Sequence, residues 1–481
     1  MANAYAISLH RASVPLMTRV LLVSCYELGH QPFAIASPWA QLEEAGFDVH
    51  GIDASLDPVD DGSIAGAGLI AISVPMHTAL RLGVEIARRA RRVNPSAHIC
   101  LYGLYASLNA DALLGSVADS VIGGEFEAAL VELAGKLACE DAESARGRID
   151  VLERLPFVRP RRDRLPPLKR YAHLIGPEPD EVRQVGYAEA SRGCLHQCLH
   201  CPITPVYGGR FFVVPREVVL ADIEQQIAAG ARHITFGDPD FFNGIRHSMA
   251  IAQAVHASHP EITFDITVKV EHILKHKGRL AELARLGCIF LVSAIESLSD
   301  RVLEELEKGH TGADAHEAVR LTREAGIALR PSFVAFTPWT TMSDFIDICD
   351  FVLRDLVDHV DPIQLAVRLL IPPGSAILRH DRPRPWLGAL DAEAFGYKWE
   401  HPDPRMDRLH AQVIAIVEDA TRSRSDGAAT IEAVRRAAYE TAGLALPGAA
   451  TAMRVRRFVP KLSEPWFCCA EPNLAQVHQV Q

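Results

Sequence analysis

Short apolar, β-branched runs alternate with helical stretches twice along this chain of 481 residues. In the first alternation the expected strands are 19–25, 47–52, 68–73, 98–102 and 120–122. Between two of them, residues 79–93 repeat apolar side chains at helical spacing, as at Leu80, Val84 and Ala87. Strands that alternate with helices usually pair in parallel, because each helix carries the chain back across the sheet. We therefore expect an α/β fold that begins with a doubly wound, Rossmann-type sheet.

The second alternation runs for six cycles from residue 185. The expected strands are 185–190, 233–236, 263–268, 288–294, 328–335 and 363–367. Pro215 opens one of the clearest helices, with Val219, Ile223 and Ile227 on one face. Six strand–helix units with short connections predict a partial (β/α)6 barrel, and such barrels place their chemistry at the carboxyl ends of the strands.

These patterns divide the chain into four parts. We assign residues 1–145 to the Rossmann-type domain, 146–180 to a linker rich in Arg and Pro, and 181–376 to the partial barrel. Residues 377–481 form a mostly helical region with helices expected at 406–421 and 430–442. The turn at Gly123 and Gly124, after the last strand of the first sheet, is where such folds bind ligands.

Composition excludes several classes of protein. The net charge is −11 with scattered arginines, so nucleic acid is not an expected partner. No apolar run reaches the roughly 18 residues of a membrane span, and the first 16 residues lack the pattern of a signal peptide. Ten unevenly spaced cysteines do not resemble a disulfide framework. We therefore expect a cytoplasmic protein whose thiols stay reduced.

Three cysteines lie in one short loop directly after the first expected barrel strand: Cys194, Cys198 and Cys201. Three thiolates at this spacing can hold three corners of a cuboidal [4Fe–4S] cluster, which is normally held by four thiolates. No nearby cysteine supplies the fourth ligand. One iron would therefore stay open to a substrate.

Two other interpretations of the loop remain open. Zinc could bind the three cysteines together with His196 or His200, since Cys₃His is a common structural zinc site. Zinc ligands, however, usually come as two distant pairs. The thiols could also be unrelated buried side chains, although a loop rich in His and Gln is not typical of a core.

The cysteine spacing resembles the signature of the radical S-adenosylmethionine (SAM) superfamily. The resemblance implies that the open iron binds SAM and that an electron from the cluster breaks one of its carbon–sulfur bonds. It also implies an external electron donor such as flavodoxin or ferredoxin. His200 stands where the family usually has an aromatic residue near the adenine of SAM.

The same resemblance identifies candidate SAM contacts after the second and third barrel strands. Asp238 and Asp240 occupy the place of a Gly-Gly-Glu-like turn that holds the amino group of SAM. A turn that these residues merely stabilise is the alternative. Lys269 and Glu271 end the third strand, where they would meet SAM or form a salt bridge at the rim.

Further candidates follow the fourth, fifth and sixth strands. Glu296 and Ser297 belong to a segment that resembles the family's Gly-Ile-Glu-Ser motif, and a Lys-Gly-His turn that begins at Lys308 follows it. Arg330 and Arg368 stand among apolar neighbours, so each should meet a carboxylate, for which that of SAM is one candidate.

The first domain resembles the cobalamin-binding-like domain that precedes many radical SAM cores. The loop that would carry the cobalt-ligating histidine instead runs from Cys25 to His30 and lacks that ligand. Cobalamin without a protein ligand remains open, but the sequence favours a retained scaffold with a different task.

The C-terminal tail carries adjacent cysteines, Cys468 and Cys469, within Cys-Cys-Ala-Glu-Pro. Neighbouring cysteines rarely form an unstrained disulfide, and two thiolates suit a thiophilic ion. An incidental exposed pair near the terminus is the alternative. The tail resembles that of a small family of radical SAM (seleno)proteins and of the radical SAM enzymes of arsinothricin biosynthesis. That resemblance implies that the pair holds arsenite, with Cys25 as a candidate third thiol.

We therefore expect a radical SAM enzyme that transfers a 3-amino-3-carboxypropyl group from SAM to thiol-bound arsenite. The rival enzymes are a cobalamin-dependent radical SAM methyltransferase and a peptide-modifying radical SAM enzyme. The alternative that is not an enzyme is a zinc or iron–sulfur regulatory protein. Which carbon–sulfur bond of SAM breaks depends on geometry that the sequence does not carry.

Overall fold

A computed structural model of the protein describes residues 19–176, 182–379, 383–448, 458–464, 471–472 and 474–480. Its first sheet has six parallel strands in the order β2-β1-β3-β4-β5-β6. These are β1 (Arg19–Ser24), β2 (Asp48–Asp53), β3 (Leu69–Ser73), β4 (His98–Tyr102), β5 (Ser120–Gly124) and β6 (Gly147–Val151). Five of them lie within two residues of the strands expected from the sequence. The sixth, β6, lies in the segment assigned to a linker and adds an edge strand to this sheet.

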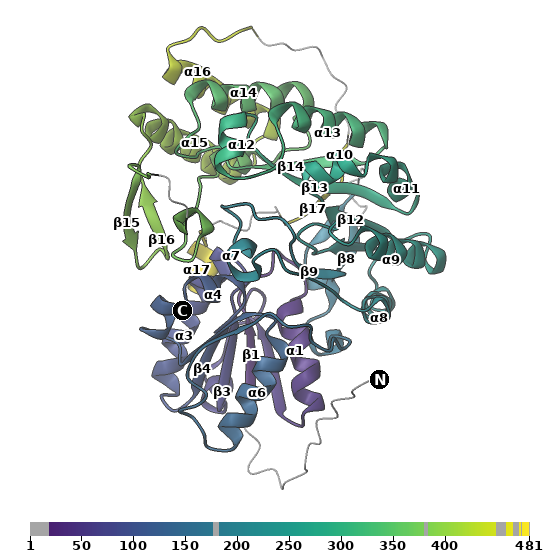
Figure 1. Cartoon of the computed structure of the whole chain (residues 1–481), viewed down its shortest axis with the longest axis vertical. Helices are drawn as coiled ribbons and strands as arrows, with labels where there is room; N and C mark the ends of the chain where they lie inside the picture. Colours follow the sequence, from purple (N-terminus) through teal and green to yellow (C-terminus); the bar gives the residue numbers. More distant parts are fainter. Residues whose placement is uncertain are drawn as a thin grey trace.

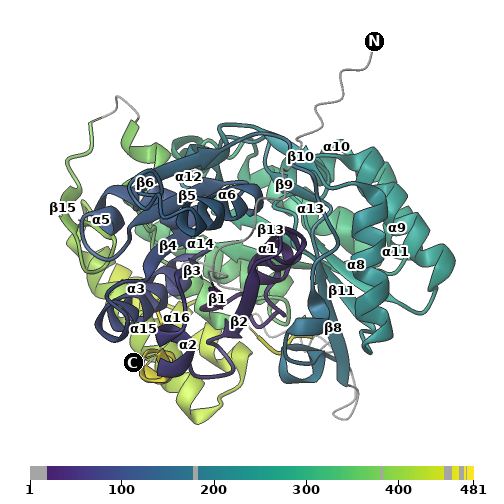
Figure 2. The ribbon, with the colours of Figure 1, turned by 90° about the horizontal axis from the view of Figure 1, so that it is seen from below.

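Helices cover both faces of the first sheet (Figures 1 and 2). One face packs on α1 (Phe33–Glu44) and α6 (Glu127–Ala138), and the other on α2 (Asp61–Ala65), α3 (His77–Val93), α4 (Leu104–Leu108) and α5 (Ala110–Leu114). Along β1, Val20 and Leu22 join the first core, whereas Leu21 and Val23 join the second. The chain leaves β1 and β3 in opposite directions, so their carboxyl ends form the crevice where such sheets bind ligands.

The second sheet is a half-barrel of five parallel strands with an antiparallel extension. Its order is β14-β13-β12-β11-β8-β7-β17. The parallel strands are β8 (Val182–Ala188), β11 (His233–Phe236), β12 (Thr263–Thr267), β13 (Cys288–Glu296) and β14 (Ala328–Phe333). The short strands β7 (His173–Ile175) and β17 (Lys461–Leu462) extend it beyond β8. The expected α/β architecture, a Rossmann-like sheet followed by a radical SAM-type partial barrel, is confirmed.

Helices follow the barrel strands and pack outside them (Figure 1). They are α8 (Arg216–Ala228), α9 (Ile245–Ser258), α10 (Val270–Lys275), α11 (Leu280–Arg285), α12 (Asp300–Glu305), α13 (Gly312–Glu324) and α14 (Met342–Phe351). Pro215 precedes α8 as expected, and Val219 and Ile223 on that helix are buried.

The sixth barrel strand expected at 363–367 is wrong. Residues Pro362–Ala366 form a 3₁₀ helix, whose start is fixed by Asp361 accepting the backbone N–H of Ile363. Only a single parallel bridge, between Phe336 and Arg368, continues the sheet next to β14. A short apolar run is compatible with either conformation, and Pro362 together with the Asp361 cap favours the helical turn.

The cysteine loop is closed at its base by a small antiparallel ribbon. Strands β9 (Ser191–Gly193) and β10 (Phe211–Val213) pair on either side of the loop and of the short helix α7 (Ile203–Tyr207). Gly193 has a φ of 71°, and a Cβ there would lie 2.4 Å from the carbonyl oxygen of Arg210. Only glycine fits this position, directly before Cys194.

The C-terminal region begins with a hairpin, β15 (Leu387–Asp391) and β16 (Gly396–Trp399), and continues into helices. Helix α15 (Pro404–Ser423) packs against α16 (Gly427–Ala442), which packs against α14, and the two helices enclose those expected at 406–421 and 430–442. The last helix, α17 (Leu474–Val480), returns to the first domain and lies beside α3 (Figure 1). None of the helices in the described part of the chain is long and apolar enough to cross a membrane.

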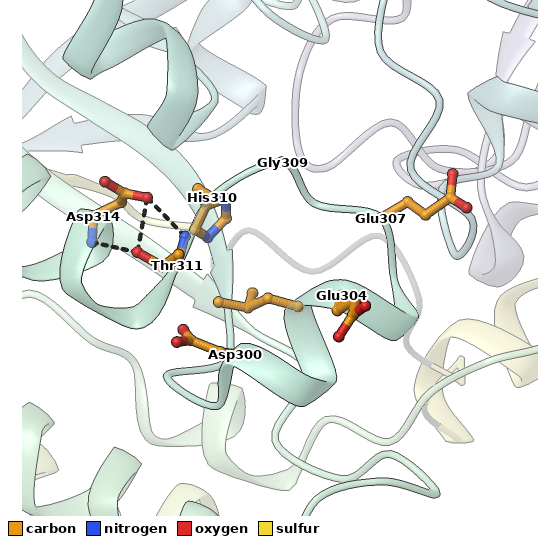
Figure 3. A pocket seen from close by; sticks show the side chains of 8 residues that line it. Asp300, Glu304, Glu307, Gly309, His310, Thr311 and Asp314 are labelled. Atoms are coloured by element: carbon orange, nitrogen blue, oxygen red, sulfur yellow. Dashed lines mark hydrogen bonds between the residues drawn. The ribbon is translucent and has the colours of Figure 1, made fainter.

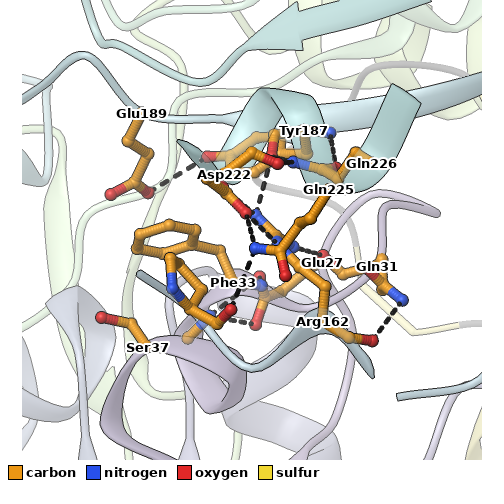
Figure 4. Close-up of polar contacts among 12 residues, drawn as sticks. Glu27, Gln31, Phe33, Ser37, Arg162, Tyr187, Glu189, Asp222, Gln225 and Gln226 are labelled. Carbon is orange, nitrogen blue, oxygen red and sulfur yellow. Dashed lines mark hydrogen bonds and ion pairs between the residues drawn. The ribbon is translucent and has the colours of Figure 1, made fainter. Parts of the chain in front are cut away.

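One buried ion pair joins the two sheets through the connecting segment (Figure 4). Arg162 forms a bidentate pair with Asp222 of α8, with both N···O distances 3.0 Å, and both side chains are 4% exposed. The same guanidinium donates to the carbonyl oxygens of Gln31 and Tyr187, at 2.9 and 2.7 Å. Arg162 therefore ties the loop after β1 to the first barrel strand.

Arg162→Leu should destabilise the protein by about 3–5 kcal/mol, because it leaves Asp222 buried without a counter-charge. Urea unfolding measures this loss. The control is Arg320→Leu on α13, which removes only surface ion pairs with Glu317 and Glu324 and should cost less than about 1 kcal/mol. Equal effects of the two substitutions would contradict the proposed link.

Candidate active site

The three loop cysteines lie at the carboxyl end of the half-barrel, as expected. Cys198 is buried, and Cys194 and Cys201 are half-buried. Burial, followed by the neighbouring Cys198, raises the pKa of Cys201 to about 12. A metal ion must supply the charge that makes such a thiol a thiolate. Thiols of this kind at the barrel mouth suit a metal cluster better than catalysis by a free thiolate.

The spread of the three thiols favours a cluster over a single zinc ion. Thiolates on one zinc lie about 3.8 Å apart, because Zn–S bonds of about 2.3 Å are arranged tetrahedrally. Cys194, Cys198 and Cys201 do not form a group whose ligand atoms all lie within 4.8 Å of one another. The three thiols are therefore not arranged as ligands of one zinc ion would be.

The amide of Asn243, in the loop after β11, adds a hydrogen-bond donor to this group. Its Nδ2 lies 3.4 Å from the Sγ of Cys194. Hydrogen bonds to cluster sulfurs tune the reduction potential. This contact could not be predicted from the sequence, because an Asn in a loop has many possible roles.

The first histidine of the loop is held by Asp240, directly beyond β11. The Asp240 Oδ2 lies 3.2 Å from His196 Nε2 and 2.8 Å from His272 Nδ1. The three side chains are close enough to share a metal ion. However, Lys269 Nζ lies 3.2 Å from His196 Nδ1, so Nδ1 accepts a hydrogen bond from the ammonium and Nε2 carries the ring proton. The group is therefore a hydrogen-bonded bridge, with Asp240 accepting from the cysteine loop.

The second histidine of the loop is held by Glu296, at the end of β13. His200 Nε2 lies 3.2 Å from Glu296 Oε1, and Lys308 Nζ lies 3.5 Å from the same oxygen. Burial would raise the pKa of Glu296, but the ammonium of Lys308 and the imidazole of His200 lower it to about 2. Burial would lower the pKa of Lys308, but Glu296 and then the thiols of Cys198 and Cys201 raise it. A buried ammonium therefore faces the thiols.

The remaining candidate SAM contacts near the loop differ in how far protein contacts already occupy their polar groups. Lys269, 9% exposed, lies 3.3 Å from Glu271, and a Cβ on Gly309 would touch both side chains. These two polar groups therefore face the cysteine loop and the Lys-Gly-His turn. By contrast, Ser297 is fully buried and its hydroxyl accepts the N–H of Ser299 at 3.1 Å.

Asp238 is committed to the loop itself. Its carboxylate accepts the N–H of Ala190 at 2.9 Å and the hydroxyl of Ser191. Burial raises its pKa to about 7. Gly237 leaves room for the Tyr187 hydroxyl, which would lie 1.8 Å from a Cβ there. Asp238 therefore shapes the base of the cysteine loop.

The two arginines of the later strands lie in different surroundings. Arg368 meets a carboxylate as expected, with Asp407 at 2.8 Å, and its guanidinium stacks on Trp399 at 3.6 Å. Arg330 on β14 has no carboxylate partner among the described residues, and its Nη1 is buried without a hydrogen bond. Of these two arginines, Arg330 therefore has a guanidinium nitrogen without a hydrogen-bond partner among the described residues.

Cys468 and Cys469 lie outside the described residues, but the residues that flank them do not. Glu464 accepts a hydrogen bond from Tyr26, in the loop after β1. Glu471 pairs with His77 at 2.8 Å and Arg81 at 3.6 Å, at the start of α3. The two flanks therefore contact the loop after β1 and the first turns of α3, at the crevice of the first sheet.

A second buried network joins the first domain to the cysteine loop, and the sequence did not reveal it. Arg192, two residues before Cys194, contacts three carboxylates, with N···O distances of 2.6–3.0 Å. They belong to Glu125, Glu127 and Glu189. Charged residues directly after a buried strand, as at Glu125, were the available signal.

Comparison with known proteins identifies the barrel. Residues 189–352 match the family model of the radical SAM superfamily. A putative methylthiotransferase of Methanocaldococcus jannaschii is 23% identical over 188 residues, which cover 36% of this chain and 40% of that protein. The match therefore spans about two fifths of that relative. An uncharacterized methyltransferase of Pyrococcus horikoshii is 22% identical over 312 residues, 61% of this chain and 64% of that protein.

Two solved structures share the two-domain architecture. The radical SAM methyltransferase TsrM of Kitasatospora setae, with cobalamin and a [4Fe–4S] cluster bound, has a TM-score of 0.63 and 17% identity over 92% of this chain and 93% of that chain. The cobalamin-dependent radical SAM enzyme OxsB has a TM-score of 0.66 and 15% identity over 89% of this chain and 72% of that one. At these identities the likeness concerns the fold. The barrel, which carries three thiols at its mouth, is therefore similar to the radical SAM superfamily over residues 189–352.

Proposed function

We propose that this radical SAM enzyme is a methyltransferase that works with cobalamin held by its N-terminal domain. The observation that carries the proposal is the continuous likeness to TsrM, which extends over both domains rather than over the barrel alone. OxsB, whose solved structure holds aqua-cobalamin, has the same order of domains. This proposal differs from the expectation from the sequence, which favoured a retained scaffold with a different task over cobalamin binding.

Orphaned polar atoms in the first domain support a ligand at its crevice. Ser73 Oγ, His77 Nδ1 and Asn109 Oδ1 are buried without hydrogen-bond partners, and they follow the ends of β3 and β4. Buried polar atoms without partners are uncommon in folded proteins. A cofactor with many amide groups would satisfy such atoms.

The part of the same sheet edge at β5 and β6 leaves less room for a cofactor. A Cβ on Gly123 would lie 2.5 Å from Asp150 and 2.6 Å from Ser107, so protein atoms already fill the space beside the Gly-Gly turn. The loop after β1 carries Glu27, which accepts the backbone N–H of Phe33 at the start of α1. We therefore place the cofactor at β1, β3 and β4, with no cobalt ligand from the loop after β1.

At the barrel mouth, Cys194, Cys198 and Cys201 would hold a [4Fe–4S] cluster, which supplies an electron to SAM at its open iron. Asp240 and Glu296 fix the loop that carries these ligands, and Lys308 offsets the negative charge of the thiolates. Lys269 and Glu271 offer one cation and one anion to the charged groups of SAM. Cobalamin would supply a carrier for the methyl group.

Reconstitution under anaerobic conditions tests the proposal. With iron, sulfide and hydroxocobalamin, the protein should retain about one cluster and one cobalamin through gel filtration. Incubation with SAM and reductant should yield S-adenosylhomocysteine and 5′-deoxyadenosine. Cys198→Ala should lose the cluster and SAM cleavage, whereas Cys139→Ala, at an exposed cysteine of the first domain, should keep both. A protein that retains the cluster but no cobalamin would refute the cobalamin assignment.

Lys308→Met should destabilise the protein by about 3–5 kcal/mol, because it leaves the Glu296 carboxylate buried with only His200 as partner. The double variant Lys308→Met/Glu296→Gln removes both charges and should recover much of this loss in urea unfolding. Because Lys308 also faces the cysteines, the double variant should still show an altered cluster reduction potential. A double variant that is no more stable than Lys308→Met would contradict the pairing.

A second candidate is the transfer of a 3-amino-3-carboxypropyl group to arsenite bound by Cys468 and Cys469. It is favoured by the contacts of Glu464 and Glu471 with the crevice loops, since these residues flank the cysteine pair in the chain. Cys25 is less suited as a third ligand. Its thiol is 1% exposed, and burial, followed by Asp53 and Glu27, raises its pKa strongly.

The product of SAM separates the two candidates. Arsenite, SAM and reductant should yield 5′-methylthioadenosine if the 3-amino-3-carboxypropyl group is transferred, and mass spectrometry detects it. Cys468→Ser/Cys469→Ser should abolish this product, whereas Cys139→Ser should not. Production of S-adenosylhomocysteine with no effect of arsenite would exclude the arsenic candidate.

A further inference from the structure

One pocket lies outside the proposed cluster and SAM residues, on α12 and the turn that follows it (Figure 3). It has a volume of about 510 Å³, within the range of small-molecule sites. Its lining is Asp300, Leu303, Glu304, Glu307, Gly309, His310, Thr311 and Asp314. Four of these eight residues are acidic, and none is Lys or Arg.

His310 adds a buried, unpartnered acceptor to this lining. The residue is 7% exposed, and its Nδ1 has no hydrogen-bond partner. Its Nε2 lies 3.3 Å from the carbonyl oxygen of Ile295, so Nε2 carries the proton and Nδ1 presents a lone pair. Burial, followed by the charge of Lys308, lowers the pKa of His310 to about 4, so the imidazole is neutral near pH 7. A ligand that meets Nδ1 must therefore donate a hydrogen bond.

The local backbone holds two of the carboxylates in place. Asp300 Oδ1 accepts the N–H of Gly312 at 2.8 Å. Asp314 Oδ2 accepts the N–H and hydroxyl of Thr311, both at 2.8 Å, in the capping box of α13. These bonds use one oxygen of each carboxylate, and both residues line the pocket. The acidic wall is thus preformed.

We propose that this pocket binds the ammonium or guanidinium group of a small organic cation. The carboxylates supply negative charge, His310 Nδ1 supplies a neutral acceptor, and Leu303 supplies an apolar surface for an alkyl chain. A bare metal ion would leave most of the volume unfilled, and an anion would meet the negative charge of Asp300, Glu304 and Asp314.

The pocket borders the barrel mouth through a single turn. Gly309 lines the pocket, and a Cβ on it would lie 3.4 Å from Lys269 Nζ and 3.0 Å from Glu271 Oε2. The preceding residue, Lys308, contacts Glu296. A cation in the pocket therefore lies on the other side of the turn from residues that we assign to SAM, where it can anchor the basic end of a substrate.

Calorimetric titration of the reconstituted full chain tests the site without turnover. Cadaverine should bind, and glutarate, which has the same number of carbons and the opposite charge, should not. Affinity for cadaverine should fall as the salt concentration rises, because the lining acids are mostly exposed. Binding of glutarate as strongly as cadaverine, or of Ca²⁺ but not cadaverine, would overturn the proposal.

Variants at Glu304 locate the binding. Glu304→Gln should weaken cadaverine binding about threefold, and Glu304→Lys about tenfold, since an exposed ion pair contributes up to about 1 kcal/mol and reversal adds repulsion. The control Glu418→Gln removes an equal charge on α15, away from the pocket, and should leave affinity unchanged. Equal affinities in all variants would place cadaverine elsewhere.

Reductive cleavage of SAM without added substrate separates this inference from the proposed function. Among the described residues, no side-chain hydrogen bond or ion pair joins Glu304 to Asp240, Glu296 or Lys308, so its variants should cleave SAM at the wild-type rate. Loss of cadaverine binding with intact SAM cleavage supports the pocket. A failure of SAM cleavage in the wild type bears on the radical chemistry and leaves the binding result standing.

Discussion

The site depends on two carboxylates that hold the cysteine loop by its histidines. Asp240 ends the turn after β11 and bonds His196, and Glu296 ends β13 and bonds His200. Because barrel strands are rigid and parallel, their ends fix the two carboxylates relative to each other. A loop with few apolar side chains cannot be positioned by packing alone. Charged hydrogen bonds from two strands do this instead.

Charge balance explains why these residues are buried together. Glu296 and the cysteines would repel one another if all were ionised, and Lys308 lies among them. Arg192 performs a related task on the other side of the loop, where it contacts Glu125, Glu127 and Glu189. Removing either cation would leave buried carboxylates without compensation, which is costly in a low-dielectric interior. The cysteine loop is therefore stabilised by opposite charges on both sides.

Much of this could be predicted from local sequence. Five strands of the first sheet and the five parallel barrel strands follow from β-branched runs between helices, whereas β6, β7 and β17 were not expected, and the three cysteines follow from their spacing. The sixth barrel strand could not be predicted, because Pro362 and the Asp361 cap turn an apolar run into a 3₁₀ helix. Partners across the fold were equally hidden: Arg368 was expected to meet a carboxylate, but only the structure identifies Asp407. Local patterns specify elements, whereas long-range pairing decides which polar residues are free for a ligand.

The polar contacts that each residue already makes also narrow the set of residues that can bind SAM. The Asp238 carboxylate accepts the N–H of Ala190 at the base of the cysteine loop, and the Ser297 hydroxyl accepts the N–H of Ser299 in its own loop, so using them for SAM would break bonds that shape the site. Lys269 and Glu271 are bonded mainly to each other and, through Lys269, to His196 at the mouth. A pair of this kind can exchange its mutual contact for the carboxylate and amino group of SAM without leaving a buried charge unpaired. Its position against Gly309 makes the Lys-Gly-His turn the natural boundary between SAM and a substrate beyond it.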